Sequence, residues 1–432
     1  MYKTLILTLA LSFCSVAAEV HTLTLDQAIG LAMKQNPDIL LSRLDQRKAG
    51  EAIRIAKDPF VPKVYSGSGL AYTYGYPNSI DGNAPSIFQI RTEMAVYNRP
   101  KRYALAEARE NARGALIGSR AKDDVVVYQT ASLFLDAAEV TRSLDFATRE
   151  ADTLDKVNQS VHALVQEGRQ LPVSGKESDL ALARAQQHVG DLGASQEYLE
   201  QALADVLGFP SGDRVRAQPP SESLQAELSK YLPESEDHAV NQALANSREV
   251  KQLESQLLAK QLEVRSQTSA HVPQVDLVAQ YSLFAKYAYA NFFQKFQRNN
   301  AQIGFSVTLP LLVGSAPSAQ ASQAELDLAK LHIQVNETRS RIALDTRKGY
   351  RDLHRAEVAR NVAKLDLEVA RDQLSVLLAQ SDEGKASESQ LNQARIAEQN
   401  KCLAFYDSEH TLERARLNML HQTGDLVAAL IK

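Results

Sequence analysis

The chain has 432 residues, of which 44% are hydrophobic, so it has enough apolar side chains for one large domain or for several smaller ones. Its net charge is only −4 although 23% of its residues are charged, and it contains no long basic block. Because nucleic-acid binding needs a basic surface, this composition excludes nucleic acid as a partner.

The first residues have the layout of a secretory signal peptide. Lys3 supplies a positive charge, residues 5–13 form an apolar run, and the small Ala18 stands just before Glu19. This layout predicts that residues 1–18 are a signal peptide that is cleaved after Ala18. The chain is therefore expected to be exported from the cytoplasm.

Two cysteines bear on whether the exported chain carries a lipid or a disulfide. Cys14 is compatible with a lipoprotein signal, but the bulky Phe13 precedes it where a small residue is usual, so a plain cleaved signal is favoured. After cleavage Cys402 is the remaining cysteine, which excludes an internal disulfide. No later apolar run approaches the roughly 18 residues of a membrane-spanning helix, so the exported chain is either soluble or inserted as a β-barrel.

Two stretches of the chain read alike at a distance of 211 residues. Residues 60–76 and 271–287 both place Val-Pro-x-Val before an alternating, tyrosine-bearing run, and helical segments at the same distance precede them. This pattern predicts an internally duplicated chain. The predicted parts are a first repeat over residues 19–210, a linker over 211–236, a second repeat over 237–424 and a C-terminal tail over 425–432.

The repeated Val-Pro pairs predict a switch from helix to strand. Proline cannot continue a helix, and it restricts the residue before it to extended conformations. Val61-Pro62 and Val272-Pro273 are therefore expected to end one helix and to start one strand in each repeat.

Four runs alternate between apolar and polar residues, which is typical of strands with one apolar face. They cover about residues 63–76, 87–98, 274–287 and 301–310. Polar side chains at alternate positions are expected to face water, namely Gln89, Arg91, Glu93, Gln302, Ser306 and Thr308. Taken alone, four such strands also fit a soluble sandwich with one buried face.

After each pair of strands the chain is almost free of proline and glycine, over about residues 101–167 and 318–383. Apolar or small residues recur there at three-and-four spacing, as in a coiled coil. In the second stretch they are Ala363, Leu367, Ala370, Leu374 and Leu377. At 1.5 Å of rise per residue, such helices reach roughly 100 Å, which is longer than a globular core can cover.

Both long helices end in the same short element, glutamate, glycine and a basic residue. Glycine at a helix end accepts a left-handed cap, so sharp turns between antiparallel helices are predicted near 168–175 and 384–388. Gly168 and Gly384 are 216 residues apart, five more than the distance between the strands, and the extra residues are expected near 311–318.

The order of these features resembles the TolC-like family of outer-membrane efflux proteins. Four phrases read like recurrent segments of that family: "LTLDQAIGLAMKQNPDI", "HVPQVDL", "EGKASESQLNQARIAEQN" and "LERARLNMLHQTGDL". The resemblance covers essentially the whole mature chain. It implies an α+β membrane protein in which three copies each give four strands to one twelve-stranded barrel, with long helical hairpins forming a periplasmic α-helical tunnel.

The resemblance also implies a function and partners. The expected protein is the outer-membrane channel of a tripartite efflux pump or of a type I secretion system. A homotrimer surrounded by outer-membrane lipid would meet a periplasmic membrane-fusion adaptor, and through it an inner-membrane pump driven by protons or by ATP. The alternative is a secreted or periplasmic coiled-coil scaffold protein without a pore.

No catalytic pattern is present in the sequence. The chain lacks His-Glu-x-x-His, Gly-x-Ser-x-Gly and a phosphate-binding loop, and its nine histidines are scattered rather than clustered. The chain is therefore predicted not to be an enzyme, and to have no cofactor and no metal site.

By the same resemblance, the hairpin tips are expected to contact the adaptor. The residues concerned are Glu167, Gly168, Arg169, Leu171 and Pro172 in the first tip and Glu383, Gly384, Lys385, Ala386 and Ser387 in the second. A purely structural role remains open, because a glycine that caps a helix and solvated charges need no partner.

The tips are also the expected periplasmic gate. Family members often carry a gate aspartate six residues beyond the tip glycine, but here Ser174 and Gln390 hold those positions. Acidic residues nearby are alternative gate residues, because rings of carboxylates favour cations, although each also fits ordinary solvation at a helix end. They are Glu177, Asp179, Asp382 and Glu388.

Overall fold

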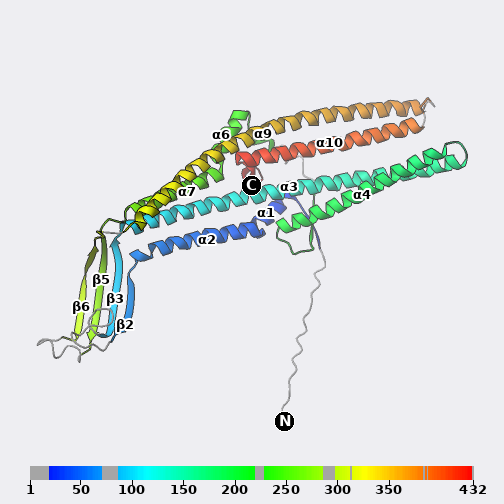
Figure 1. The fold of residues 1–432 in the computed structure, drawn as a ribbon. Coiled ribbons are helices and arrows are strands. Elements are labelled where there is room, and N and C mark those ends of the chain that lie inside the picture. The colour runs from blue at the N-terminus through cyan, green and yellow to red at the C-terminus, as the bar shows by residue number, and fades with distance from the viewer. Residues whose placement is uncertain are drawn as a thin grey trace, which may run out of the picture. The chain divides into compact units, whose positions relative to one another are not determined.

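The computed structural model describes residues 19–70, 86–218, 228–285, 297–311, 314–382, 385–386 and 388–430 (Figure 1). The chain forms two compact units, each built from segments far apart in the sequence. The helical unit comprises Met1–Leu40, Lys122–Asn246 and Ile342–Lys432, and the sheet unit comprises Leu41–Ala121 and Ser247–Arg341. The predicted signal peptide lies outside the described residues.

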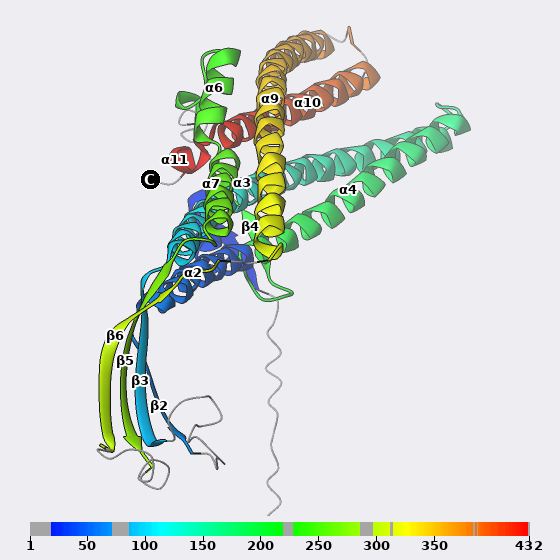
Figure 2. The same ribbon diagram turned by 60° about the vertical axis from the view of Figure 1, so that its left-hand side comes forward.

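The sheet unit contains one antiparallel sheet of four strands in the order β2-β3-β5-β6 (Figure 2). The strands are β2 (Lys63–Gly69), β3 (Ser86–Tyr97), β5 (Gln274–Phe284) and β6 (Asn299–Thr308). The middle pairing, β3 with β5, joins the two halves of the chain. The last residues of the predicted runs 63–76 and 274–287 lie partly outside the described residues.

Each Val-Pro pair lies between a helix and a strand, where the sequence places it. A 3-10 turn, η1 (Asp58–Phe60), follows α2 (Pro37–Lys57), and Val61 is extended with φ −104° and ψ 134° before β2 begins at Lys63. In the second half, α7 (Arg248–Thr268) ends shortly before Val272-Pro273, and β5 begins directly after that pair.

The order and lengths of the elements in the first half recur in the second. Two helices of 11 and 21 residues come first in each half, and two strands and two long helices follow. The first half contains α1 (Leu25–Gln35), α2, α3 (Arg99–Gln166) and α4 (Pro172–Val206); the second contains α6 (Glu236–Asn246), α7, α9 (Ala316–Asp382) and α10 (Glu388–Thr423). Asn98 alone links β3 to α3, whereas residues 309–315 link β6 to α9.

The core of the helical unit lies where the bases of both hairpins meet. Phe134 of α3, Leu203 of α4 and Leu420 of α10 are fully buried there together with Ile29 of α1. A smaller cluster, which includes Ala239 and Met419, joins α6, α9 and α10. Beyond these clusters the hairpin helices continue as exposed coiled coils.

A second, two-stranded sheet in the helical unit was not anticipated from the sequence. β1 (Val20–Leu23) pairs in parallel with β4 (Arg214–Ala217), and β4 lies inside the predicted linker 211–236. The predicted tail likewise contains a short helix, α11 (Leu426–Leu430). Strands of four residues are too short to show a period, so the predicted set of four strands was incomplete.

None of the described helices is both long enough and apolar enough to cross a membrane.

Two asparagine side chains form hydrogen bonds to the ends of the returning hairpin helices. The buried side chain of Asn36 donates from Nδ2 to the Val206 carbonyl at 2.7 Å, and its Oδ1 accepts from the Asp38 and Ile39 amides, which caps α2. In the second half, Asn246 donates to the Thr423 carbonyl at 2.9 Å. The next residue, Ser247, caps α7, because its hydroxyl accepts a hydrogen bond from the Val250 amide at 3.2 Å.

In the first half, Asn36 both caps α2 and bonds to the Val206 carbonyl. Asn36→Ala is therefore expected to lower the free energy of unfolding by about 2 kcal/mol, because it removes the helix cap and leaves a buried carbonyl without a hydrogen bond. Ser247→Ala removes a cap alone and is expected to cost about 1 kcal/mol. Denaturant titration of both variants in detergent checks the difference. Equal losses would show that the bond from Asn36 to the Val206 carbonyl contributes nothing.

Candidate functional site

The sheet has one polar face that runs across all four strands. Arg91 on β3 is paired with Gln280 on β5, and Gln280 is paired with Gln302 on β6. Rows on either side continue this face. Its polar members are Lys63, Tyr65, Gln89, Arg91, Glu93, Gln274, Asp276, Gln280, Ser282, Gln302, Ser306 and Thr308. The six residues that the sequence predicts to face water therefore lie on one face.

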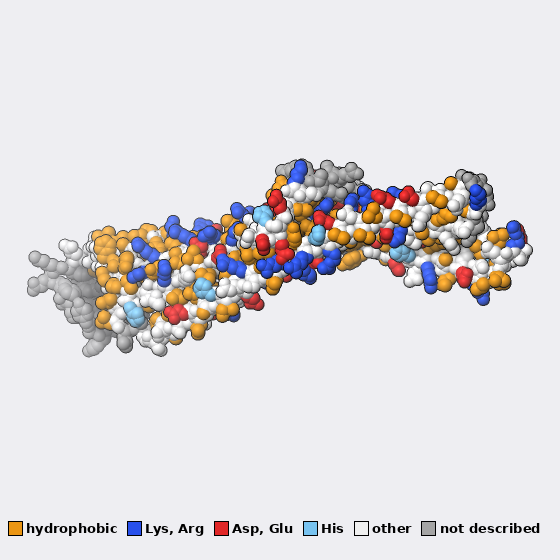
Figure 3. Space-filling model, turned by 90° about the horizontal axis from the view of Figure 1, so that it is seen from above, with side chains coloured by type: hydrophobic (Ala, Val, Ile, Leu, Met, Phe, Trp, Pro, Cys, Tyr) orange, Lys and Arg blue, Asp and Glu red, His pale blue; other side chains and the backbone are white. Residues whose placement is uncertain are grey.

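The opposite face is apolar and largely uncovered. Ile303, Phe305 and Val307 of β6 are 77%, 67% and 66% exposed, and Leu277 and Met94 lie in one row with Phe305. Figure 3 shows hydrophobic side chains gathered over the strand end of the sheet unit. A continuous apolar surface of this kind marks contact with lipid or with another protein.

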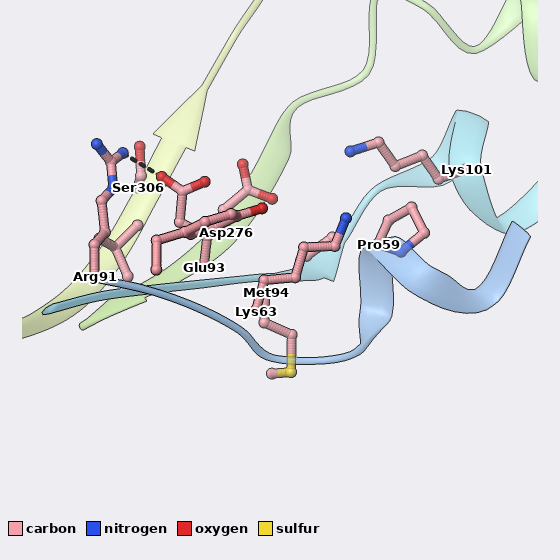
Figure 4. Close-up of a pocket in the computed structure, with 11 residues that line it drawn as sticks. Pro59, Lys63, Arg91, Glu93, Met94, Lys101, Asp276 and Ser306 are labelled. Atoms are coloured by element: carbon pink, nitrogen blue, oxygen red, sulfur yellow. Dashed lines mark ion pairs between the residues drawn. The ribbon is translucent and has the colours of Figure 1, made fainter. Parts of the chain in front are cut away.

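A cavity of about 280 Å³ opens on the polar face, close to the helix ends of the strands (Figure 4). Charged groups of both signs line it. Lys63 pairs with Asp58, and Arg91 pairs with Glu93 on its own strand. Within the described part of the chain, neither Lys101 nor Asp276 forms an ion pair. The cavity wall thus carries balanced charge.

Within the described residues, neither outer strand of the sheet has a second strand partner. Every residue of β6 is exposed, and five of the seven residues of β2 are exposed. An edge strand presents a row of backbone N–H and C=O groups that pair readily with another strand. The sheet is therefore open at an edge from the first half of the chain and at an edge from the second.

The first hairpin tip is a sharp glycine turn. Gly168 has φ 71°, and the Arg169 amide donates back to the Leu164 carbonyl at 2.8 Å, which closes the end of α3. Arg169 lies 3.3 Å from Glu167, and Leu171 is 70% exposed just before Pro172 starts α4. The five predicted adaptor-contact residues of this tip therefore lie together at the end of the hairpin.

The second tip is described only in part. Glu383, Gly384 and Ser387 lie outside the described residues, as do the side chains of Asp382 and Glu388, which end α9 and begin α10. The amides of Lys385 and Ala386 donate to the Gln380 carbonyl at 2.8 and 3.3 Å, so the chain also turns back here. Lys385 is exposed at this turn, and Gln390 is exposed on the first turn of α10.

Asp179, one of the predicted gate residues, is held by its own hairpin. Its Oδ1 lies 2.8 Å from His162 Nε2 on α3 and accepts from Asn158 at 3.2 Å. These hydrogen bonds, first that of His162 and then that of Asn158, lower the pKa of Asp179. Ser174 and Glu177, on the same helix, form no comparable bond among the described residues.

The second hairpin lacks the hydrogen bond that joins His162 to Asp179 in the first hairpin, which is called the brace below. The positions 216 residues beyond His162 and Asp179 are held by Leu378 and Arg395. The role of His162 was missed from the sequence, because a partner 17 residues away on another helix leaves no local signal. The two hairpins thus differ in how their helices are joined near the tip.

Within the described part of the chain, no three His, Cys, Asp or Glu side chains are grouped so that they could hold a metal ion.

A comparison with protein families agrees with this arrangement. Residues 239–428, from α6 to α11, match the family model described as outer membrane efflux protein. The match covers most of the second half of the chain. The first half has the same order of helices and strands as the matched half.

Solved outer-membrane channels share the fold. The Campylobacter jejuni CmeC outer membrane channel is similar with a TM-score of 0.75 and 13% identity, over 93% of this chain and 86% of that chain. The Vibrio cholerae outer membrane protein VceC gives 0.72 and 14%, over 93% and 96% of the two chains. The open-state Neisseria gonorrhoeae MtrE outer membrane channel gives 0.67 and 14%, over 94% and 88%. A search of curated protein sequences finds no match.

His162→Ala is expected to loosen the first hairpin near its tip. A carboxyl with a lowered pKa contributes stability above its unfolded pKa and loses it as the pH falls through the lowered folded value. At pH 7 the wild-type hairpin should therefore keep the full contribution of Asp179, and the variant should lose it. Hydrogen–deuterium exchange of residues 155–182, corrected for intrinsic rates, measures the change.

The matched control is Gln159→Ala, on an exposed neighbouring position of α3. Exchange that rises equally in both variants, or in neither, would show that the bond between His162 and Asp179 does not brace the hairpin.

Proposed function

We propose that the protein is an outer-membrane efflux channel, in which three copies complete one barrel and one helical tunnel. The observation that carries this proposal is the four-stranded sheet with a polar face, an exposed apolar face and two open edges. The match of residues 239–428 to the outer membrane efflux protein model and the fold shared with solved channels support it.

The number of strands requires more than one copy, and the resemblance to outer-membrane efflux proteins implies three. Four strands are too few to close a barrel, because closure with a filled interior needs about eight. In three copies, β6 of one sheet pairs with β2 of the next, and twelve strands close without an edge. β3, β5 and β6 have 12, 11 and 10 residues, close to the 9–11 that a tilted strand needs to cross a bilayer.

The two faces of the sheet then have separate roles. Phe305 and its apolar neighbours contact lipid, while Arg91, Glu93 and the other polar residues line a water-filled lumen. The balanced charges around the cavity leave the lumen wall without a dominant sign in that region. Such a wall suits a passage for varied solutes rather than a site for one ligand.

The long hairpins extend the passage into the periplasm. α3 has 68 residues and α9 has 67, so each helix alone is roughly 100 Å long. Their tips, with the Glu167–Arg169 pair and the exposed Leu171, are the proposed contact for a periplasmic membrane-fusion adaptor. An inner-membrane pump, driven by protons or by ATP, supplies the energy of transport in either a tripartite efflux pump or a type I secretion system.

Cell fractionation separates this function from that of a soluble coiled-coil scaffold. The mature chain is expected in the outer membrane, and in detergent it should run as a trimer that gives conductance in planar bilayers. A chain that is released by osmotic shock and runs as a monomer would overturn the channel.

The two faces of β6 provide a sharper test. Phe305→Arg places a charge toward lipid and is expected to cost about 2–4 kcal/mol near the middle of the bilayer, so the yield of folded trimer should fall. Gln302→Arg, on the other face of the same strand, should leave the yield unchanged. Trimer yields in detergent extracts measure both, and equal yields would contradict the assignment of the faces.

The tips are tested by charge reversal. Arg169→Glu and Lys385→Glu are expected to weaken photo-cross-linking from a benzophenone residue at position 171 to the adaptor, because each reverses an exposed charge at a tip. Lys156→Glu makes the same change on an exposed position of α3 away from the tip and serves as the control. Unchanged adaptor cross-linking in the first two variants would exclude these charges from the contact.

A further inference from the structure

The cavity on the polar face of the sheet lies over short side chains. Two neighbouring rows of residues cross the strands there, namely Lys63, Glu93, Val278 and Gly304 in one row and Ala95, Asp276 and Ser306 in the other. Ala95 and Ser306 are small, and a Cβ atom added at Gly304 would meet nothing within 4 Å. The row beside them carries the large side chains of Tyr65 and Arg91. This change of side-chain size leaves the space of about 280 Å³.

The charged side chains around this cavity fall into two groups. Those that are already paired are Lys63 with Asp58 and Arg91 with Glu93. Lys101 of α3 and Asp276 of β5 also line the cavity (Figure 4), but neither forms an ion pair within the described residues. Asp276 is partly buried, and a carboxylate that is withdrawn from water needs a counter-charge. One ammonium group and one carboxylate are therefore left for a molecule that enters the cavity.

A buried asparagine fixes these two residues relative to each other. Asn98, which is 1% exposed, accepts through Oδ1 from the Lys101 amide at 3.0 Å, at the start of α3. Its Nδ2 donates at 2.9 Å to Oε1 of Gln274, which lies two residues before Asp276 on β5. The start of α3 is thus tied to β5. The backbone positions of Lys101 and Asp276 are set before any ligand arrives, which lowers the cost of binding one.

We infer that this cavity binds small zwitterionic solutes, with the carboxylate of the solute on Lys101 and its ammonium group on Asp276. The hydroxyl groups of Tyr65 and Ser306 line the same space and supply hydrogen bonds for neutral polar atoms. A volume of about 280 Å³ is near the lower limit of ligand pockets, roughly 300 Å³, so the solute has about the size of a dipeptide. This inference rests on the proposed channel, in which the polar face borders the lumen that solutes cross.

The two charges select a class of solutes and not one compound. An anion would pair with Lys101 and leave Asp276 without a partner, and a cation would do the reverse. A solute with both charges pairs with both side chains and leaves the net charge of the wall unchanged. Because Lys101 is exposed, the binding is weak. Weak binding suits a passage, since a transported solute must also leave each site that it occupies.

Three probes of one size test the charge pattern on the full-length protein in detergent. Alanylalanine carries both charges, its N-acetyl derivative carries the carboxylate alone, and its C-terminal amide carries the ammonium group alone. Saturation-transfer difference NMR at pH 7 and low salt measures the three dissociation constants. The dipeptide is expected to bind about tenfold more tightly than either derivative, because each derivative loses one charge-assisted contact.

Two variants assign the charges to their residues. Lys101→Gln is expected to weaken binding of the dipeptide about tenfold and to leave binding of the amide unchanged, because the amide has no carboxylate for Lys101. Asp276→Asn should weaken the dipeptide to a similar degree and leave the N-acetyl derivative unchanged. A variant that is merely misfolded would weaken all three probes alike, so this crossed pattern separates the site from a defect in folding.

Lys57→Gln is the matched control, because Lys57 is exposed at the end of α2 and does not line the cavity. It should leave all three constants unchanged. Equal binding of the three probes, or of the dipeptide to both cavity variants and the wild type, would overturn the site. If the wild type is then still a trimer that conducts, the channel stands without it. A monomer without conductance would overturn the channel, and the probes would still decide whether the cavity binds zwitterions.

Discussion

A four-stranded antiparallel sheet with one apolar face, one polar face and two open edges needs further partners to bury that face and to pair those edges. In this protein the apolar residues of β6 are mostly solvent-exposed, and nothing in the described chain covers them. The remaining organisation depends on this constraint. In the proposed channel, copies of the chain pair with the edges and lipid covers the apolar face, which leaves the polar face to surround water.

The helical unit meets a similar requirement by different means. Its core, around Phe134 and Leu420, fixes the bases of both hairpins, and Asn36 and Asn246 tie the helix ends together there. Beyond the core the hairpin helices are held by neighbouring helices and by scattered ion pairs, which contribute little when exposed. In the proposed ring, neighbouring copies cover the exposed sides of these helices.

The functional features proposed for this protein are surfaces of the sheet and of the hairpin tips. The charges on the polar face are balanced, and the first tip combines a turn with an exposed ion pair and an exposed leucine. The brace between His162 and Asp179 exists in the first hairpin, and the second has Leu378 and Arg395 at the matching positions. The two halves thus have the same order of helices and strands, while the described contacts near their tips differ.

The sequence by itself determined the long helices, the sheet strands and their two faces, because period-two and three-and-four spacing and the Val-Pro pairs are local signals. It did not reveal β1 and β4, which are too short for a period, nor the partner of Asp179, which is close only after the hairpin folds. The contact between α3 and α10 could not be predicted from the sequence either, because Asp136 and Arg414, which form it, are 278 residues apart in the chain. Only the tertiary structure brings such residues together, and so only the tertiary structure decided which helices pack side by side.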